Sequence, residues 1–163
     1  VDIDIEGVWP QNHCLGEVQC ALGTKILDRV DALIDQRRAR AEQFIQAFDE
    51  YPELKFQSVP DHIDSAWHLL PAFYDESVTG KSNDDFIKLM SEEYLVKVIA
   101  QYYPLYRYPL FESFGFGDSD CPNTDRFYDN MVSFPFHSWM PEDHFQYMIQ
   151  ATKDVLNSFR ETS

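Results

Sequence analysis

An apolar pattern with helical spacing runs from Glu17 to about Glu50 and limits the possible folds of this 163-residue chain more than any other feature. Apolar residues recur there at intervals of three and four, which places them on one face of a helix. They are Val18, Leu22, Ile26, Val30, Leu33, Ile34, Ala41, Phe44, Ile45 and Phe48. Tyr51-Pro52 ends the pattern, because proline cannot continue a helix. We expect one helix over residues 17–50, which is longer than a single compact layer needs and therefore suits a bridge between two bodies.

The rest of the chain alternates short strand and helix patterns. Apolar runs of strand type occupy residues 54–59, 66–74 (broken by Pro71), 96–99 and 131–136. Helical patterns occupy residues 84–93, 123–130 and 141–159, the first capped by Ser82 or Asn83 and the last opened by Pro141. This order predicts a single α+β domain over residues 1–163. It divides into a lead-in segment (1–16), the long helix (17–50) and an α+β body (54–160).

Composition restricts the classes of partner. The chain carries 28 acidic and 13 basic residues, a formal charge of −15, which repels phosphate backbones and anionic lipids. We therefore expect no binding to nucleic acid or to a membrane, and no apolar run reaches membrane-spanning length. Hydrophobic residues at 44% and aromatic residues at 15% indicate a folded domain. The three cysteines form no CxxC pair, so we expect reduced thiols and a cytoplasmic location.

No motif in the chain supplies a complete active site. The five histidines lack the spacing of a metal site, so we expect no metal ligands. Gly115 and Gly117 are close in sequence but lack the strand-to-helix setting of a phosphate-binding loop. No GxSxG sequence occurs and no cysteine has the context of a nucleophile, so we predict no catalytic residue here. The chain begins with Val1 rather than methionine, which fits processing, removal of a tag, or a chain cut from a longer protein.

A segment rich in aromatic residues and proline, 101–117, is the most unusual part of the body. Its residues 102–111 contain five aromatic rings, two prolines and Arg107. Proline stiffens such a segment and lowers the entropy that is lost when its side chains bind a ligand. The rings can instead form a small satellite core beneath a long loop. We expect most rings to pack and one or two hydroxyl groups to remain free for function.

Three motifs, taken together, resemble one enzyme family. The first is Asn12-x-x-Leu15-x-Glu17-x-Gln19-Cys20-Ala21-x-Gly23, followed by Leu27-x-Arg29-Val30-Asp31 and Arg37-Arg38. The second is Tyr102-x-Pro104-Leu105-Tyr106. The third is Ser133-Phe134-Pro135-Phe136-His137 with Met140-Pro141-Glu142-Asp143. In order and spacing, from Asn12 to Phe159, they resemble the C-terminal part of the DegT/StrS-type aminotransferases, which use pyridoxal phosphate to aminate keto-sugars and cyclitols.

This resemblance implies the small C-terminal domain of a fold-type-I aminotransferase, with a long N-terminal helix and a short antiparallel sheet with helices. The large domain that holds pyridoxal 5′-phosphate and its Schiff-base lysine would precede this region, and Lys25 does not match that lysine. The family further implies a homodimer with an active site shared across the interface. Its substrates are an amino-acid donor and a small keto-sugar or cyclitol. The chain alone is therefore expected to be inactive and to hold no cofactor.

The resemblance also assigns candidate site residues. Asn12 matches the family asparagine that reaches across the dimer to the cofactor phosphate of the partner subunit, a role that suits a neutral amide donor. His13, Gln101, Tyr102 and Tyr106 match positions that bind substrate, and Gln101 stands where many members have histidine.

One departure from the family pattern bears on the substrate. The family usually has arginine and then methionine where this chain has Cys14 and Leu15. Without the guanidinium, a bidentate clamp for an anion is lost. The form Asn12-His13-Cys14-Leu15, with Tyr103-Pro104-Leu105-Tyr106-Arg107-x-Pro109-Leu110-Phe111, most resembles the branch that acts on cyclitols of the scyllo-inosose type. A neutral ring ketone without a phosphate suits the lost charge.

Two other readings stay open at this point. The chain can be a free-standing remnant that keeps the fold as a binding or dimerisation module. It can also be a generic acidic α+β domain whose likeness to the family is one of packing alone, against which the three ordered motifs argue. The length of the reading frame upstream of Val1 separates a domain of a larger enzyme from a free-standing remnant.

Overall fold

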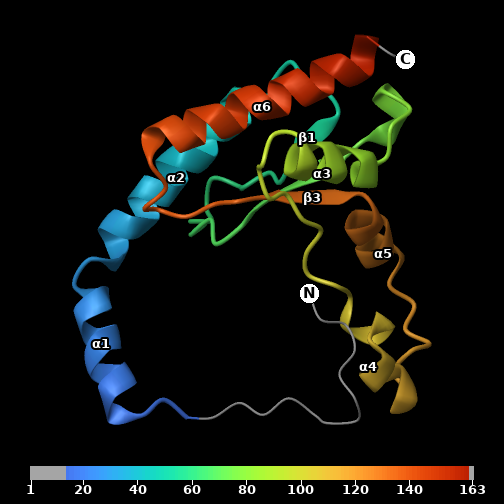
Figure 1. Ribbon diagram of the computed structural model, residues 1–163. Helices are drawn as coiled ribbons and strands as arrows, with labels where there is room; N and C mark the ends of the chain where they lie inside the picture. Colours follow the sequence, from blue (N-terminus) through green and yellow to red (C-terminus); the bar gives the residue numbers. More distant parts are fainter. Residues whose placement is uncertain (1–13, 162–163) are drawn as a thin grey trace.

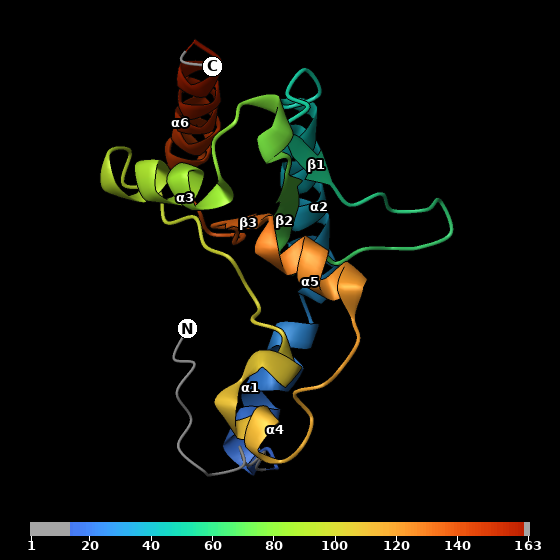
Figure 2. The same cartoon turned by 90° about the vertical axis from the view of Figure 1, so that its right-hand side faces the viewer.

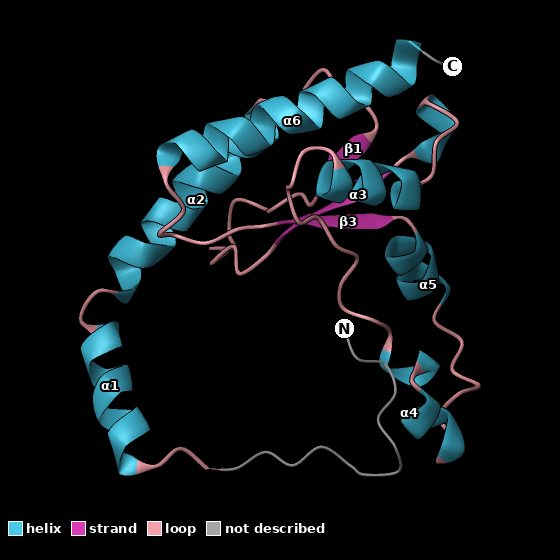
Figure 3. Ribbon diagram, in the orientation of Figure 1, coloured by secondary structure: helices cyan, strands magenta, loops and turns pink. Residues whose placement is uncertain are grey.

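A three-stranded antiparallel sheet organises the part of the chain that the computed structural model describes, residues 14–161 (Figure 1). Its strands are β1 (Leu54–Phe56), β2 (Leu70–Tyr74) and β3 (Met131–Phe134), in the order β1-β2-β3. The α-helices are α1 (Glu17–Leu27), α2 (Val30–Gln46), α3 (Asn83–Glu92), α4 (Pro109–Ser113), α5 (Pro122–Asp129) and α6 (Glu142–Glu161). Two short 3₁₀ helices are η1 (Glu76–Val78) and η2 (Leu105–Arg107). Figure 3 shows how small the sheet is beside its helices.

Aromatic rings join three helices to one face of this sheet. Phe44 of α2 lies 4.7 Å from Phe134 of β3 and 6.3 Å from Phe145 of α6, measured between ring centroids. Phe86 of α3 contacts the same Phe134 ring at 6.2 Å. All four residues are at most 3% exposed. Helices α2, α3 and α6 therefore share one core, whereas α1, α4 and α5 lie towards the opposite side in both views (Figures 1 and 2).

Pro71 lies inside the central strand, where we expected it to break the pattern. It pairs with Ser133, whose backbone N–H and C=O bond instead to Ile99 on the other side, at 2.8 and 3.1 Å. The backbone of Pro71 therefore points away from β3, and β1 has already ended opposite Ala72. At this position the strand makes no hydrogen bond to either neighbouring strand. The missing N–H of Pro71 therefore removes no hydrogen bond from the sheet.

The predicted single helix over residues 17–50 is wrong, because the chain forms α1 and α2 with a break at Asp28 and Arg29. Arg29 leaves helical geometry (φ −132°, ψ 9°), and its N–H bonds back only three residues, to Ile26. No residue of α1 is buried, whereas α2 is held by the fully buried Ala41 and Phe44. No buried side chain of α1 therefore holds this helix on the axis of α2. Helix α2 also ends early, at Gln46, and turns follow before Pro52.

The expected strands are shorter than their apolar runs. The runs at 54–59 and 66–74 form only β1 and β2, and a loop connects them. That loop is fixed by Arg37 of α2, which donates from Nε to the backbone oxygen of Trp67 at 2.7 Å. The run at 96–99 contributes a single bridge, Ile99 to Ser133. The segment 101–117 contains η2 and α4 rather than loop alone.

The helices predicted from capping signals are confirmed. Ser82 caps α3 through its side chain, which accepts from the backbone N–H of Asp85, and Asp85 completes the capping box. Helices α5 and α6 begin within one residue of the expected positions, and Pro122 occupies the first turn of α5. Among the described residues no helix is long and apolar enough to cross a membrane.

A buried carboxylate fastens the end of α6 to the sheet. Glu53, which is 0% exposed, precedes β1 and accepts from Arg160 Nε at 2.5 Å and from Nη2 at 2.7 Å. The same guanidinium donates to the backbone oxygen of Glu50 and lies 4.6 Å from the centroid of the Tyr51 ring. This contact raises the pKa of Arg160, chiefly through the hydrogen bond to Glu53.

Replacing Glu53 by glutamine should lower the free energy of unfolding by about 1–3 kcal/mol. The amide keeps the shape of the side chain but leaves Arg160, whose side chain is 37% exposed, without its counter-charge. Urea denaturation measures the change. Glu50→Gln, at an exposed position in the preceding turn, is the matched control and should change stability by less than about 0.5 kcal/mol. Equal effects of the two substitutions would contradict this role of Glu53.

Candidate functional site

Three of the five residues predicted to bind cofactor or substrate lie in the part of the chain that the structure describes. They are Gln101, Tyr102 and Tyr106, on the segment that leads from the Ile99 bridge to α4. Asn12 and His13 lie outside the described residues. The assignments of these two residues therefore stay predictions. Cys14 and Leu15, the two departures from the family pattern, are both exposed.

Gln101 and Tyr102 are neighbours with different surroundings. The side-chain Nε2 of Gln101 donates to the Oγ of Ser133 at 3.3 Å, which ties this residue to β3. Tyr102 is 63% exposed, and its hydroxyl makes no hydrogen bond within residues 14–161. Of the three predicted substrate residues that are described, Tyr102 has the most exposed side chain, and its hydroxyl has both its proton and its lone pairs to offer a ligand.

Tyr106 is already engaged by another residue. Its hydroxyl donates to Asp125 Oδ1 on α5 at 2.8 Å. Burial of the phenol, followed by the hydrogen bond to Asp125, raises the pKa of Tyr106 to about 12. The phenol is therefore protonated throughout the physiological range, and its proton is directed to Asp125.

Arg107 completes this cluster. It donates to both oxygens of Asp129, from Nη1 at 2.5 Å and from Nη2 at 3.0 Å, and it also contacts Asp125. The hydrogen bond from Arg107 lowers the pKa of Asp129, and the hydrogen bond to Asp129 raises that of Arg107. The sequence reasoning missed both aspartates. Their spacing of four residues on a helix, which places them on one face, is the signal that would have found them.

Rings of the 101–117 segment pack together beside this cluster, as expected. Tyr103 meets Tyr108 at 5.0 Å and Tyr128 at 5.4 Å, both edge to face. The guanidinium of Arg107 lies 5.8 Å from the centroid of Tyr128. Tyr128 belongs to α5, so the same helix supplies one ring and the two carboxylates that hold the segment.

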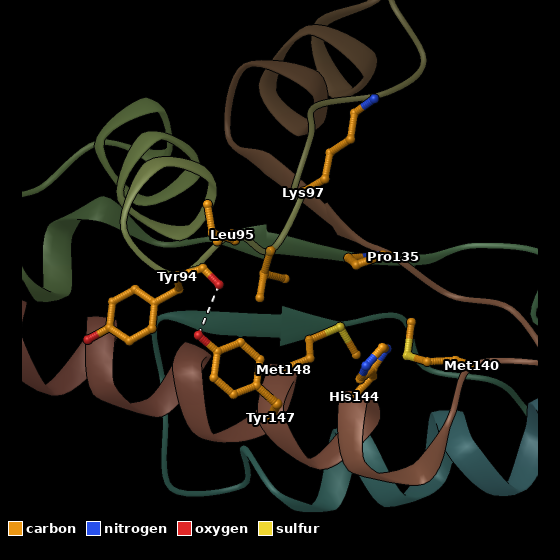
Figure 4. A pocket seen from close by; sticks show the side chains of 9 residues that line it. Tyr94, Leu95, Lys97, Pro135, Met140, His144, Tyr147 and Met148 are labelled. Atoms are coloured by element: carbon orange, nitrogen blue, oxygen red, sulfur yellow. Dashed lines mark hydrogen bonds between the residues drawn. The ribbon is translucent and has the colours of Figure 1, made fainter.

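A hollow of about 470 Å³ lies elsewhere on the body, between α6 and the segment that follows α3 (Figure 4). Its lining is mainly apolar and includes Val96, Met140 and Met148. Tyr147 closes one side by donating from its hydroxyl to the backbone oxygen of Tyr94 at 3.0 Å. None of the predicted substrate residues that the structure describes lines this hollow.

Apolar residues are exposed on α1 and on the 101–117 segment. On and beside α1 they are Leu15, Val18, Leu22, Ile26 and Leu27, which are 48–73% exposed. On the 101–117 segment they include Leu105, Phe114 and Phe116, which are 53–63% exposed. Both elements lie on the side of the sheet away from α6 (Figures 1 and 2). A surface of this kind is typical of a site that contacts another protein body.

The chain matches the model of the DegT/DnrJ/EryC1/StrS aminotransferase family over residues 8–153. It is 28% identical to the spore coat polysaccharide biosynthesis protein SpsC of Bacillus subtilis (strain 168), over 86% of this chain and 36% of that protein. It is 25% identical to the dTDP-3-amino-3,4,6-trideoxy-alpha-D-glucose transaminase of Micromonospora megalomicea subsp. nigra, over 89% of this chain and 38% of that protein. The chain thus spans little more than a third of the length of these curated relatives.

Solved structures of aminotransferases share the fold. Helicobacter pylori PseC, an aminotransferase involved in the biosynthesis of pseudoaminic acid, superposes with a TM-score of 0.75 at 20% identity. The superposition covers 91% of this chain and 39% of PseC. The PLP form of the putative sugar aminotransferase Spr1654 from Streptococcus pneumoniae gives 0.75 at 18% identity, over 89% of this chain and 36% of that one. The expected α+β fold of a smaller domain of such enzymes is confirmed.

The titration of Tyr106 tests the geometry of this cluster. A folded-state pKa near 12, against about 10 for a free phenol, means that the contribution of the protonated hydroxyl to folding is complete below pH 10 and is lost as the pH rises towards 12. The tyrosinate absorbance that Tyr106→Phe removes should therefore have its midpoint near pH 12. In the background of Asp125→Asn the midpoint should fall towards 10. A midpoint of 10 in the unaltered background would contradict the geometry of the Tyr106–Asp125 contact.

Proposed function

Because this chain belongs to the DegT/DnrJ/EryC1/StrS aminotransferase family, we propose that it is the C-terminal domain of a pyridoxal-phosphate-dependent aminotransferase that aminates a keto-sugar or cyclitol. In this proposal the chain is catalytically incomplete alone. A large domain supplies the cofactor site, and the complete enzyme is a cytoplasmic homodimer. An amino acid is the amino donor.

The lack of any buried residue in α1 is the observation that carries the proposal of incompleteness. A helix in water keeps its shape mainly through the packing of its apolar face. Here Val18, Leu22 and Ile26, at spacings of four, leave that face 48–72% exposed. In the proposal this exposed face of α1 packs against a second body, the cofactor domain.

The surroundings of Lys25 support the same proposal. Lys25 is 81% exposed at its side chain and pairs with Asp28 at 3.2 Å on the surface of α1. A lysine that binds pyridoxal phosphate needs a pocket that orients the cofactor and excludes competing reactions. Lys25 lies in no such pocket, which fits a Schiff-base lysine on the large domain. The cofactor, when bound there, stabilises negative charge on the carbon that loses a proton.

Two observations point to different acceptors within the proposed class. Cys14 and Leu15 stand where the family usually carries arginine and methionine, and a neutral cyclitol ketone suits this loss of an anion clamp. The name of the Micromonospora megalomicea relative refers to a sugar linked to dTDP, which favours a nucleotide-linked keto-sugar. Comparing scyllo-inosose with a nucleotide-linked keto-sugar as acceptors for the complete enzyme separates the two classes.

The exposed face of α1 also favours a second candidate, a free-standing remnant that serves as a binding or dimerisation module. In that case the face is covered by another protein or a second copy, and no cofactor lysine is encoded upstream of Val1. An upstream reading frame with a cofactor domain supports the first proposal, and a start codon just before Val1 supports the second.

The isolated 163-residue chain should not bind pyridoxal phosphate through a specific lysine. When the two are mixed, we expect no visible absorbance band of a bound cofactor, because the pocket that orients it is on the missing domain. Reduction with borohydride followed by peptide mapping is the second measurement. An adduct that maps to one lysine would contradict the proposal, whereas scattered traces on exposed lysines would not.

A charge on the apolar face of α1 should affect the isolated chain and the complete enzyme in opposite ways. Leu22→Asp should reduce self-association of the isolated chain in sedimentation velocity, because Leu22 is 62% exposed there. In the complete enzyme it should lower stability by about 2–4 kcal/mol, since a carboxylate would then be buried against the large domain. Thr24→Asp, at an exposed polar position on the opposite face of the same helix, is the control. Equal behaviour of both variants in the complete enzyme would exclude an interface at Leu22.

A further inference from the structure

Four side chains from two distant segments meet at one point. Tyr106 and Arg107 belong to η2, and Asp125 and Asp129 lie one helical turn apart on α5. Asp125 Oδ1 accepts from both Tyr106 and Arg107, while Asp129 accepts from the two terminal nitrogens of Arg107. Hydrogen bonds to ionised groups, and forked arginine–carboxylate pairs above all, are the strong ones in proteins.

Helix α5 is itself fixed to the sheet, so side chains that bind α5 are held in place relative to the sheet. Asn130, at its end, accepts on its backbone oxygen from the N–H of Tyr74 in β2 at 2.7 Å. Arg126 of α5 lies 5.5 Å from the centroid of the Phe73 ring in β2. The contacts of Tyr106 and Arg107 therefore tie the 101–108 segment to the sheet, and Tyr102 projects from a segment that is held at both ends, since Gln101 is bonded to Ser133.

The donor and acceptor capacities in the cluster decide what Tyr106 can offer a ligand. An ionised aspartate only accepts hydrogen bonds and an arginine only donates them. The phenol proton of Tyr106 is therefore donated to Asp125. The phenol oxygen can then only accept a further hydrogen bond, through its free lone pair. A ring hydroxyl can donate to that lone pair, whereas a ketone or phosphate oxygen cannot. Burial, followed by the hydrogen bond to Asp125, raises the pKa of Tyr106 to about 12, so the hydroxyl keeps this proton.

We propose that Asp125 is a positioning residue for the substrate segment, which holds Tyr106 and Arg107 so that Tyr106 accepts a hydrogen bond from a ring hydroxyl of the acceptor substrate. This rests on the proposed function as a keto-sugar or cyclitol aminotransferase. It gives Tyr106, which the resemblance places among the substrate-binding residues, the role of a hydrogen-bond acceptor, and it adds Asp125, Asp129 and Arg107 to the residues that shape the site.

Trypsin tests the positioning on the 163-residue chain without any substrate. The protease must take the guanidinium of Arg107 into its own pocket, so cleavage after Arg107 reports release of this side chain from the two aspartates. Asp125→Asn and Asp129→Asn should each raise the rate of that cleavage about fivefold to tenfold relative to cleavage after the exposed Lys25. Asp125→Glu should restore protection in part. Asp118→Asn, at an exposed position of the preceding loop, removes the same charge and should change nothing.

Kinetics of the complete enzyme test the role in binding. The probes are scyllo-inosose and a nucleotide-linked keto-sugar as acceptors, and L-glutamate and L-glutamine as donors. Asp125→Asn and Tyr106→Phe should each raise the KM of the acceptor about tenfold and leave kcat within about twofold of the Asp118→Asn control. The spectral change that the donor alone produces should be unaffected, because the donor does not depend on the ring-hydroxyl contact.

The outcomes separate the two proposals. An acceptor KM that stays at the control value in both variants, or tryptic cleavage after Arg107 that does not rise in the aspartate variants, overturns the role of Asp125. Loss of kcat and of the donor reaction together would also overturn it, since that pattern marks general damage to the fold. If the complete enzyme reacts with no donor at all, the proposed function fails, and the tryptic rates alone then decide whether Asp125 holds the segment.

Discussion

The contact of the Phe44 ring with Phe134 and Phe145 is the interaction on which the rest of this domain depends. One ring of α2 touches the last residue of the sheet and the first buried turn of α6, so a single buried side chain joins three elements. Burial of such a ring stabilises a fold by about 1.5–3 kcal/mol, and each well-oriented aromatic pair adds about 0.5–1.5 kcal/mol. Elements that reach this cluster are fixed by it. Helix α1, which does not, is set apart by a break in the backbone.

Sequence alone predicted the elements whose signals are local. The helix after Ser82 begins at its capping box, and the helix after Met140 begins at proline and two acids, because these caps act within one turn. The break at Asp28–Arg29 could not be predicted, since periodicity shows which face is apolar but not whether anything covers it. Pro71 was misleading for a similar reason. Its effect on a strand depends on which neighbour its backbone faces, and that is decided by Ser133 and Ile99, far along the chain.

The candidate site divides in the same way. Tyr102 and Tyr106 were predicted to bind substrate because they belong to a continuous motif, and Gln101 because it stands where many members of the family have histidine; these assignments stay predictions. Asp125 and Asp129 were not found, because each is 18 or more residues from its partner and a pair of surface acids looks like any other in an acidic chain. The basic residues are the better guide to such contacts, because the chain has only 13 of them against 28 acids. Three arginines connect separate elements: Arg37 binds the backbone of the loop before β2, Arg107 binds α5, and Arg160 binds Glu53.

The shortness of β1 has a consequence for how copies of this chain can meet. An open sheet usually invites another strand to add along its free edge, which is a common route to aggregation. Here the outer edge is a strand of three residues with Lys55 at its centre, and the opposite edge is occupied in part by the Ile99 bridge to Ser133. Neither edge offers a long ladder to an incoming strand. The sheet edges are therefore poor sites for pairing with a strand of another chain. Contacts with other proteins are instead made by the helices and by the aromatic segment.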